Sequence, residues 1–491
     1  MTNKFKFLLV VFSFLFQHLS AKEFFVSSSN ELNAVLNKVT AGDVIIWKNG
    51  SYQNEKISFA PKLNGKKDLP IILRIETPGK AMFSGNSQIF ISGDYLQVEG
   101  FLFEGTCSLE KKESVINFIG QGKNANDANH CRVTNCAIIN YTLTEESGID
   151  NNFIVFEGLY NELDHCYFTG KTNKGPTVVV NYKQDENFVN GSADAPSTHH
   201  FIHHNYFGYR TFSSNGGEQI RVGVSGTSNT HGFNIVEYNL FEDTRIEAEV
   251  ISNKSCDNVY RFNTLLGNDG ALVLRHGFDC FAYGNYINGK SGRGKSGGLR
   301  AVNAHQTMFN NYLENIEGGE TPMKGPIVVM SGLVDAGINE YHPADDAIMA
   351  FNTVVNSVGP AIKIAVGNIS KGKAFIAPKN VLISGNLIIN SSGDNMDPIA
   401  ILDNSATYKL NGNIFTNGMV NNFDGFEKVS TSELTKKENL EFANKKIDKN
   451  LIAEINKRLK SQNIQLSEEE ITVFNPKWIV TKKDVGVSWM K

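Results

Sequence analysis

Between about residues 80 and 420 the hydrophobic positions fall in short runs rich in Val, Ile, Phe and Tyr, separated by Gly and Asn turns. Helical periodicity is almost absent there. One phrase recurs: an Asn, an apolar run, then Asn, Gly or Asp. From Asn239 onward its Asn-to-Asn steps are 24, 22, 26, 41, 34 and 27 residues. A phrase repeated at this period predicts an all-β solenoid, a right-handed parallel β-helix with one coil per repeat.

Two other repeat folds fit the pattern less well. Leucine-rich repeats need far more Leu, and a propeller has a more regular period. Long steps, such as 41, predict coils with an inserted loop. The repeated Asn residues can stack into a hydrogen-bonded ladder inside a solenoid, but we expect their main reason to be turn chemistry.

The two ends differ from the middle of the chain. Ser28 and Glu31 form a capping box ahead of an apolar helical stripe, which predicts an N-terminal capping helix that plugs the open solenoid. From about residue 430 the chain is rich in Lys and Glu with helical spacing. We therefore predict a catalytic β-helix domain over 22–430 and a partly helical C-terminal cap or extension over 431–491.

Residues 1–21 have the pattern of a signal peptide. Lys4 and Lys6 precede an apolar run from Phe7 to Phe16, and Ala21 is a small residue suited to cleavage. The run is too short to span a bilayer, and no later segment is long and apolar enough. We therefore expect export to a secreted or periplasmic location and a mature protein without a membrane anchor. The six cysteines are expected to be mostly buried thiols, and zinc is not expected because no CxxC pair occurs.

Composition narrows the function classes. Apolar residues make up 41% of the 491 and charged residues 20%, so the chain can bury a core. The 47 basic and 51 acidic residues give a formal net charge of −4, which argues against a general nucleic-acid binder. A local cationic cluster can still bind an anionic substrate.

Candidate chemistry gathers between residues 213 and 305. Glu247 and Glu249 are two apart, so in a strand they face one side, where oxygen ligands suit a hard cation such as Ca²⁺. Arg275 follows Lys254 by 21 residues, close to one coil, which predicts that the two lie on adjacent coils and face the same side. Arg300, 25 residues later, extends this polar face, as does His276.

Such a cluster suits β-elimination from a uronic acid. The substrate carboxylate must be neutralised by a cation, a base must remove the C5 proton, and a donor must meet the leaving oxygen at C4. Lys254 can be the base if cationic neighbours lower its pKa. Arg275 is the candidate donor, although its very high pKa makes it a poor acid, and a water or a tyrosine could complete the step.

Each residue also has a simpler interpretation. Glu247 and Glu249 could form an exposed strand face paired with Arg245, and a lone Lys254 would usually be a surface lysine. Their co-occurrence on neighbouring coils favours a site.

The motifs resemble a known family. The stretches Asn215-Gly-Gly-Glu-Gln-Ile-Arg221, Glu247-Ala-Glu249, Ile251-Ser-Asn-Lys-Ser255 and Leu274-Arg-His-Gly277 resemble the polysaccharide lyases that include alginate lyases and chondroitinase B. The resemblance runs from about residue 24 to the end. It implies a Ca²⁺-dependent right-handed β-helix, with Lys254 as base and Arg275 as acid. By the same resemblance, the implied metal ligands are Asn215, Glu218, Glu247 and Glu249, and the implied substrate-binding residues are Arg221, His276 and Arg300. Tyr341 lies on the long inserted coil, and from that position we predict that it closes over the cleft and binds substrate.

The resemblance favours an anionic uronic-acid polysaccharide as substrate, with alginate first and chondroitin or dermatan sulfate as the alternative. Two other classes stay open: a β-helix glycoside hydrolase, which needs two or three carboxylic acids around the glycosidic oxygen, and a non-catalytic glycan-binding solenoid. No oligomeric state follows from the sequence.

Overall fold

The computed structural model describes residues 21–122, 126–142, 149–183, 195–212, 216–246, 248–318, 322–367, 373–390, 397–416 and 423–491. The predicted signal peptide therefore lies, except for Ala21, outside the described residues. Within them no helix is both long and apolar enough to cross a membrane.

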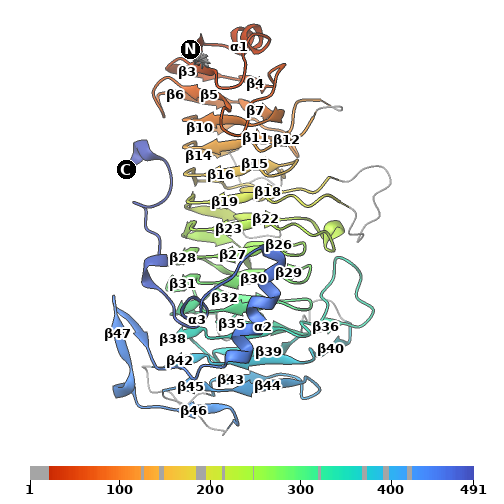
Figure 1. Ribbon diagram of the computed structural model, residues 1–491, viewed down its shortest axis with the longest axis vertical. Coiled ribbons are helices and arrows are strands. Elements are labelled where there is room, and N and C mark those ends of the chain that lie inside the picture. The colour runs from red at the N-terminus through yellow and green to blue at the C-terminus, as the bar shows by residue number, and fades with distance from the viewer. Residues whose placement is uncertain are drawn as a thin grey trace, which may run out of the picture.

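Three long parallel sheets run side by side along the molecule (Figure 1). Sheet A consists of β1 (Glu23–Val26), β2 (Val44–Trp47), β5 (Ile71–Ile75), β9 (Leu96–Glu99), β13 (Arg132–Thr134), β16 (Glu162–Asp164), β19 (Phe201–His203), β23 (Ile235–Glu237), β27 (Val259–Arg261), β30 (Phe281–Tyr283), β33 (Thr307–Phe309), β37 (Ile348–Ala350), β41 (Val381–Ser384) and β44 (Tyr408–Asn411).

Sheet B consists of β3 (Gly50–Gln53), β6 (Ala81–Gly85), β10 (Leu102–Cys107), β14 (Ala137–Thr142), β17 (Tyr167–Thr169), β20 (Tyr206–Phe207), β24 (Leu240–Glu242), β28 (Thr264–Leu266), β31 (Tyr286–Asn288), β34 (Tyr312–Glu314), β38 (Thr353–Val355), β42 (Leu387–Ile389), β45 (Asn413–Phe415) and β46 (Phe426–Lys428). Sheet C consists of β4 (Lys56–Phe59), β7 (Gln88–Ile91), β11 (Ser114–Asn117), β15 (Asn152–Phe156), β18 (Val178–Val180), β22 (Ile220–Val222), β26 (Glu249–Lys254), β29 (Gly270–His276), β32 (Ser296–Ala301), β35 (Ile327–Met330), β39 (Ile362–Val366) and β43 (Ile399–Ile401).

The chain visits the sheets in the repeating order A, B, C, and each strand pairs in parallel with its equivalent one coil away. The predicted fold class, a parallel β-helix, is confirmed. Inward-facing residues of all three sheets form one continuous apolar core, which includes Ile220, Ile251, Leu272 and Leu299 on successive strands of sheet C. Because side chains alternate along a strand, the residues between these core positions face outward.

The repeated Asn residues form a ladder at the corner between sheets A and B. Eight fully buried Asn side chains take part, and from one coil to the next an Oδ1 accepts from the backbone N–H and the Nδ2 of the preceding Asn, with donor–acceptor distances of 2.9–3.2 Å. They are Asn205, Asn239, Asn263, Asn285, Asn311, Asn352, Asn386 and Asn413. Our expectation that turn chemistry is their main reason is wrong. The Asn residues instead satisfy backbone donors in the core, where an unpaired polar group is costly.

Both ends of the solenoid carry helical elements. Helix α1 (Ser29–Leu36) has Ser28 as its N-cap and buries Leu32 and Leu36 in the core at the N-terminal end. Near the other end, α2 (Lys449–Leu459) buries Leu451, Ile455 and Leu459 against outward residues of sheet A. The short α3 (Glu468–Thr472) follows.

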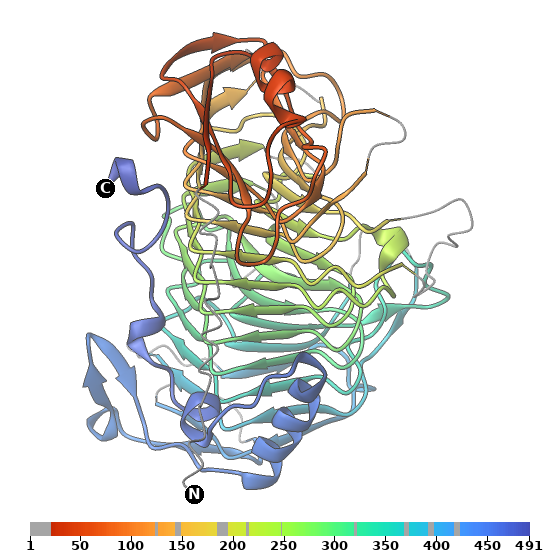
Figure 2. The same cartoon turned by 45° about the horizontal axis from the view of Figure 1, so that its top comes forward.

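The last residues then run back along the outside of the solenoid (Figures 1 and 2), where Val485 packs against Tyr206 and Val487 against Leu102. Gly486 N–H donates to the His204 carbonyl at 2.9 Å, and Ser488 N–H donates to Asn135 Oδ1 at 2.8 Å. The segment thus returns to coils far from the C-terminal end. All six cysteines are buried and free, as predicted.

Outside the three long sheets, the described residues form four short two-stranded sheets. They are β8 (Gly93–Asp94) with β12 (Ala128–Asn129), β21 (Arg210–Phe212) with β25 (Thr244–Ile246), β36 (Gly332–Leu333) with β40 (Phe375–Ile376), and β47 (Thr435–Lys437) with β48 (Leu440–Phe442). Strand β36 belongs to the inserted coil that the 41-residue step predicted, whereas its partner β40 lies on the following coil. The insertion borders the candidate site through Tyr341.

Candidate active site on sheet C

Most of the predicted site residues come together on the outer face of sheet C. They lie on the neighbouring strands β22, β26, β29 and β32. The strand register aligns Arg221 with Ser252, and Val273 with Arg300. The inward neighbours of these residues are core residues. The charged side chains of sheet C therefore lie on its outer face, on consecutive coils.

Glu249 lies between two arginines and accepts hydrogen bonds from both. Its Oε1 accepts from Arg300 Nη2 at 2.8 Å, and its Oε2 accepts from Ser252 Oγ at 2.6 Å and from Arg275 Nη1 at 3.5 Å. Glu249 and Arg300 are 3% and 1% exposed. Burial opposes ionisation of Glu249, but Arg275, Arg300 and Lys254 outweigh burial and lower its pKa to about 2. Glu249 is therefore a carboxylate at neutral pH and the counter-ion of both arginines.

Lys254 ends β26 with its side chain almost buried. It is 8% exposed, and its Nζ lies 3.8 Å from Glu218 Oε1. Burial lowers the Lys254 pKa, and the positive charges of Arg275 and Arg221 lower it further, against the opposing effect of Glu218 and Glu249. A lysine in this setting loses its proton more readily than an exposed lysine, which is the property that a general base needs.

Arg275 and His276 come from the end of β29. The Arg275 guanidinium lies over the Tyr341 ring, 5.7 Å from its centroid, and the insertion packs Tyr341 into an apolar cluster with Val328 and Met330. His276 is 1% exposed, and burial with the nearby cations Arg275 and Lys254 lowers its pKa to about 3. His276 is therefore neutral at ordinary pH, and the inserted coil stacks on the arginine that sequence reasoning placed in the site.

Glu218 is the described residue that best fits a bound cation. It is fully buried, and within the described residues neither of its carboxylate oxygens has a hydrogen-bond partner. A buried carboxylate of this kind is costly unless a cation accompanies it, and the Lys254 amine 3.8 Å away supplies that charge only while it is protonated. Two other predicted ligands, Asn215 and Glu247, lie outside the described residues. The donor set therefore fits a hard cation through Glu218, while Glu249 already contacts two arginines.

Two residues of the site were missed by sequence reasoning. Ser252 donates to Glu249, and its position two residues before Lys254 in a strand could have placed it on the outward face. Arg210, 1% exposed, donates to the carbonyls of Gly217 at 2.7 Å and Gly175 at 2.6 Å, which fixes the segment that carries Glu218. No sequence signal distinguishes Arg210 from a surface arginine.

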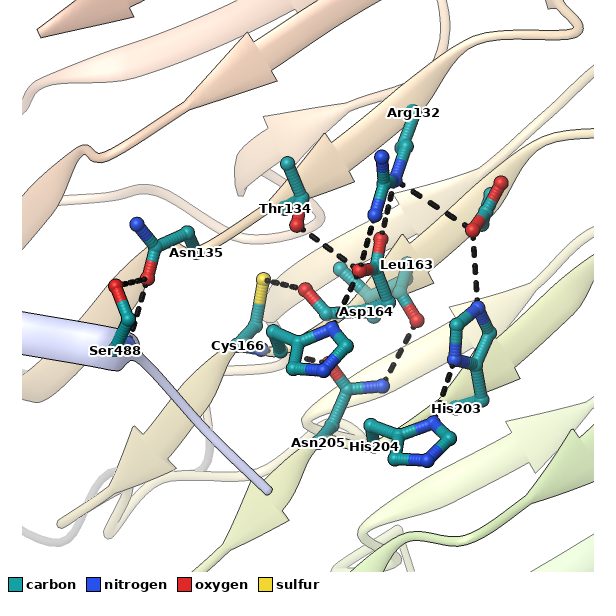
Figure 3. Close-up of polar contacts among 12 residues, drawn as sticks. Arg132, Thr134, Asn135, Leu163, Asp164, Cys166, His203, His204, Asn205 and Ser488 are labelled. Carbon is teal, nitrogen blue, oxygen red and sulfur yellow. Dashed lines mark hydrogen bonds and ion pairs between the residues drawn. The ribbon is translucent and has the colours of Figure 1, made fainter. Parts of the chain in front are cut away.

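A second polar cluster lies on sheet A, away from the predicted ligands. Among the described residues, Glu162, Asp164 and His203 are a group whose ligand atoms lie within 4.8 Å of one another. Figure 3 shows Arg132 beside Asp164, with Nε–Oδ1 and Nη2–Oδ2 distances of 2.7 and 2.6 Å. Burial opposes ionisation of Asp164, but His165 and Arg132 hold its pKa well below the usual range. The arginine already supplies the positive charge here.

Similarity to known proteins covers most of the chain. Residues 26–465 match the family model described as chondroitinase B. The chain therefore belongs to the chondroitinase B family of polysaccharide lyases, as its motifs predicted.

Among solved structures, the alginate lyase AlyGC, of polysaccharide lyase family 6, shares 30% sequence identity and a TM-score of 0.79 over 95% of this chain. The match spans 58% of the AlyGC chain, so this protein covers a little over half the length of that relative. A mannuronic acid specific family 6 lyase from human gut microbiota shares 26% identity and a TM-score of 0.71, over 95% of this chain and 96% of that one.

A family 6 lyase from Pseudopedobacter saltans, at 21% identity and a TM-score of 0.65 over 95% of this chain and 99% of that one, has the same fold. A search of curated proteins finds no match.

Proposed function

We propose that this protein cleaves alginate by β-elimination, with Lys254 as the base. The observation that carries the proposal is the Lys254 amine, almost buried, low in pKa and set among Glu218, Arg275 and Arg221 on the outer face of sheet C. A hydrolase would instead need a protonated carboxylic acid near the glycosidic oxygen, and Glu249 is held ionised.

The reaction assigns each group a step. The neutral Lys254 amine takes the C5 proton of the uronate, the electron pair of that C–H bond forms the C4–C5 double bond, and the C4–O4 bond breaks. The leaving oxygen takes a proton from a water molecule, with Arg275 positioned to stabilise the negative charge that develops on that oxygen. The products are an unsaturated uronate at the new non-reducing end and a shortened chain.

The remaining cations would orient the substrate. Arg221 lies on the same outward row as the reacting centre, where it can bind a uronate carboxylate. Arg300 lies further along this row, but it is 1% exposed and bonded to Glu249, so its predicted contact with the substrate requires this ion pair to open. Glu249 holds Arg300 and Arg275 in place. His276 is neutral and offers a hydrogen-bonding nitrogen without adding charge.

The proposed metal is Ca²⁺, held by Glu218 with Asn215 and Glu247, and Glu249 as the fourth predicted ligand. When bound, it would offset the negative charge of the substrate carboxylate and so acidify the C5 proton. Calorimetric titration of Ca²⁺ into the metal-free protein tests the site without activity. We expect binding that Glu218→Gln weakens at least about tenfold, whereas unchanged binding would exclude Glu218 as a ligand.

Two comparisons support alginate over sulfated substrates: AlyGC and the mannuronic acid specific lyase, at 30% and 26% identity. The family model, described as chondroitinase B, keeps chondroitin and dermatan sulfates as the second candidates. The test incubates the protein with alginate, chondroitin sulfate, dermatan sulfate and pectate, with and without calcium, and follows unsaturated product by its ultraviolet absorbance. Product from alginate supports the proposal, and product from a sulfated substrate alone would replace it.

We also propose that the protein is exported, from the signal-peptide pattern of residues 1–21. N-terminal sequencing of protein recovered outside the cytoplasm should begin at or near Lys22. An intact Met1 there would contradict the proposal.

A further inference from the structure

The solenoid interior is apolar over most of its length, but a polar network lies inside the coils of the candidate site. Its six side chains are each at most 4% exposed and are joined by hydrogen bonds of 2.7–3.0 Å. They are Tyr182, Asn234, Asn253, Ser255, Asn258 and Tyr260. Two of them, Asn234 and Asn258, also belong to a second corner ladder, since each accepts a backbone N–H from the preceding coil. That ladder does not explain the other four.

Asn253 is the centre of this network. Its Nδ2 donates to the carbonyls of Ser255 and His276, and its Oδ1 accepts from Asn258 Nδ2 and Tyr260 Oη, all at 2.8 Å. These four bonds use both donors and both lone pairs of a side-chain amide. A fully satisfied buried amide has one orientation and holds its partners in one place.

The bond to His276 crosses an irregularity in the sheet. Asn253 pairs with Leu274, but the next residue, Lys254, pairs with His276. Arg275 is therefore the extra residue of a β-bulge in β29, and a bulge redirects side chains. The Asn253 amide donates a hydrogen bond to the carbonyl of His276, the residue that follows this bulge.

The backbone beyond the bulge is equally constrained. Gly277 has a φ of +78°, and a Cβ built on it would lie 2.2 Å from the Ser255 carbonyl oxygen. Residues 276 and 277 thus pack directly against the chain that follows Lys254. The two strand ends that carry the proposed base and its arginine are joined from the core side.

We propose that Asn253, supported by Tyr260, is a positioning residue that sets Lys254 and Arg275 in register for elimination. This inference rests on the proposed function of the site. Asn253 faces the core and does not reach the substrate, so it acts through the backbone of its neighbours. Losing its bonds shifts the base relative to the C5 proton and leaves the substrate-binding row intact.

The test measures kcat and KM on alginate for Asn253→Ala, Tyr260→Phe and the control Asn352→Ala. Asn352 is equally buried and also makes several core hydrogen bonds, but it lies in the corner ladder between sheets A and B. We expect Asn253→Ala to lower kcat by on the order of 100-fold, as a misplacement of about 1 Å can, with KM within about twofold. Tyr260→Phe removes one bond in four and should lower kcat by a smaller factor, in the same direction.

The control should lower the melting temperature, since it leaves ladder partners unpaired, and keep kcat within about twofold. Wild-type protein without activity on any of the four polysaccharides would refute the proposed function itself. Active wild type with kcat unchanged in folded Asn253→Ala, or in Tyr260→Phe if the alanine variant does not fold, would overturn the inference alone. Equal losses of kcat in Asn352→Ala would also overturn it, because they would show general destabilisation.

Discussion

The pairing of Glu249 with Arg300 gives a prediction whose size follows from burial. The Glu249→Gln substitution keeps the shape of the side chain and removes its charge. The Arg300 side chain is 2% exposed, and in the described residues its guanidinium pairs with no other carboxylate. Breaking a buried ion pair by removing one partner costs about 3–5 kcal/mol, because the remaining charge is left without compensation. We therefore expect Glu249→Gln to lower the free energy of unfolding by about this amount.

The assay is denaturant unfolding of four proteins: wild type, Glu249→Gln, Arg300→Met, and the double variant. Removing the orphaned charge in the double variant should recover part of the loss relative to Glu249→Gln. Lys457→Met is the control, because its side chain is 77% exposed and pairs with Glu454 at the surface, and such surface pairs contribute at most about 1 kcal/mol. A loss below 1 kcal/mol for Glu249→Gln, or no recovery in the double variant, would refute the reasoning.

Three further predictions follow from single groups. Because the Lys254 pKa is lowered, kcat should rise with pH and level off below the ordinary lysine value of about 10.4, and a pH–rate profile still rising there would contradict Lys254 as base. Burial lowers the His200 pKa to about 3, so the stability present above pH 6.5 should be lost as the pH falls toward 3, by about 2 kcal/mol at pH 5. His200→Asn places at this position the residue type that the corner ladders use. Urea unfolding of this variant should therefore give no such loss between about pH 7 and pH 5. Gly277→Ala should lower the melting temperature more than Gly294→Ala, since both have positive φ but only Gly277 has a carbonyl in the way; equal shifts would argue against the close packing.

The repeat pattern was sufficient to predict the fold but not the reason for its repeated residue. The Asn phrases marked each coil correctly because hydrophobic runs and turn residues are local features. Their hydrogen bonds join residues 22 to 41 positions apart, and a single phrase carries no sign of that. Asn135 shows the difference: it opens one phrase, yet it adopts a left-handed turn with a φ of 53°, and Cys136 follows where other coils place the ladder Asn.

The sequence was sufficient to predict which coils carry the site residues, but not how the backbone of those coils is shaped. A spacing of 21 residues placed Lys254 and Arg275 on adjacent strands, as the structure shows. The bulge at Arg275 was not predictable, because the hydrogen bond that crosses it joins Asn253 to His276, 23 positions away, and local spacing carries no sign of it. The contact of Tyr341 with Arg275 depends on how the insertion folds back, which its sequence does not encode locally. The roles assigned to Asn215 and Glu247 stay predictions.

The most direct test of the central claim follows the ultraviolet absorbance of alginate incubated with wild-type protein and with Lys254→Met. Elimination creates a conjugated double bond, whereas hydrolysis does not. We predict that absorbance rises with wild type and that Lys254→Met, at equal folded concentration, slows the rise by at least about 100-fold. Shortened chains without added absorbance, or full activity in Lys254→Met, would contradict elimination with Lys254 as its base.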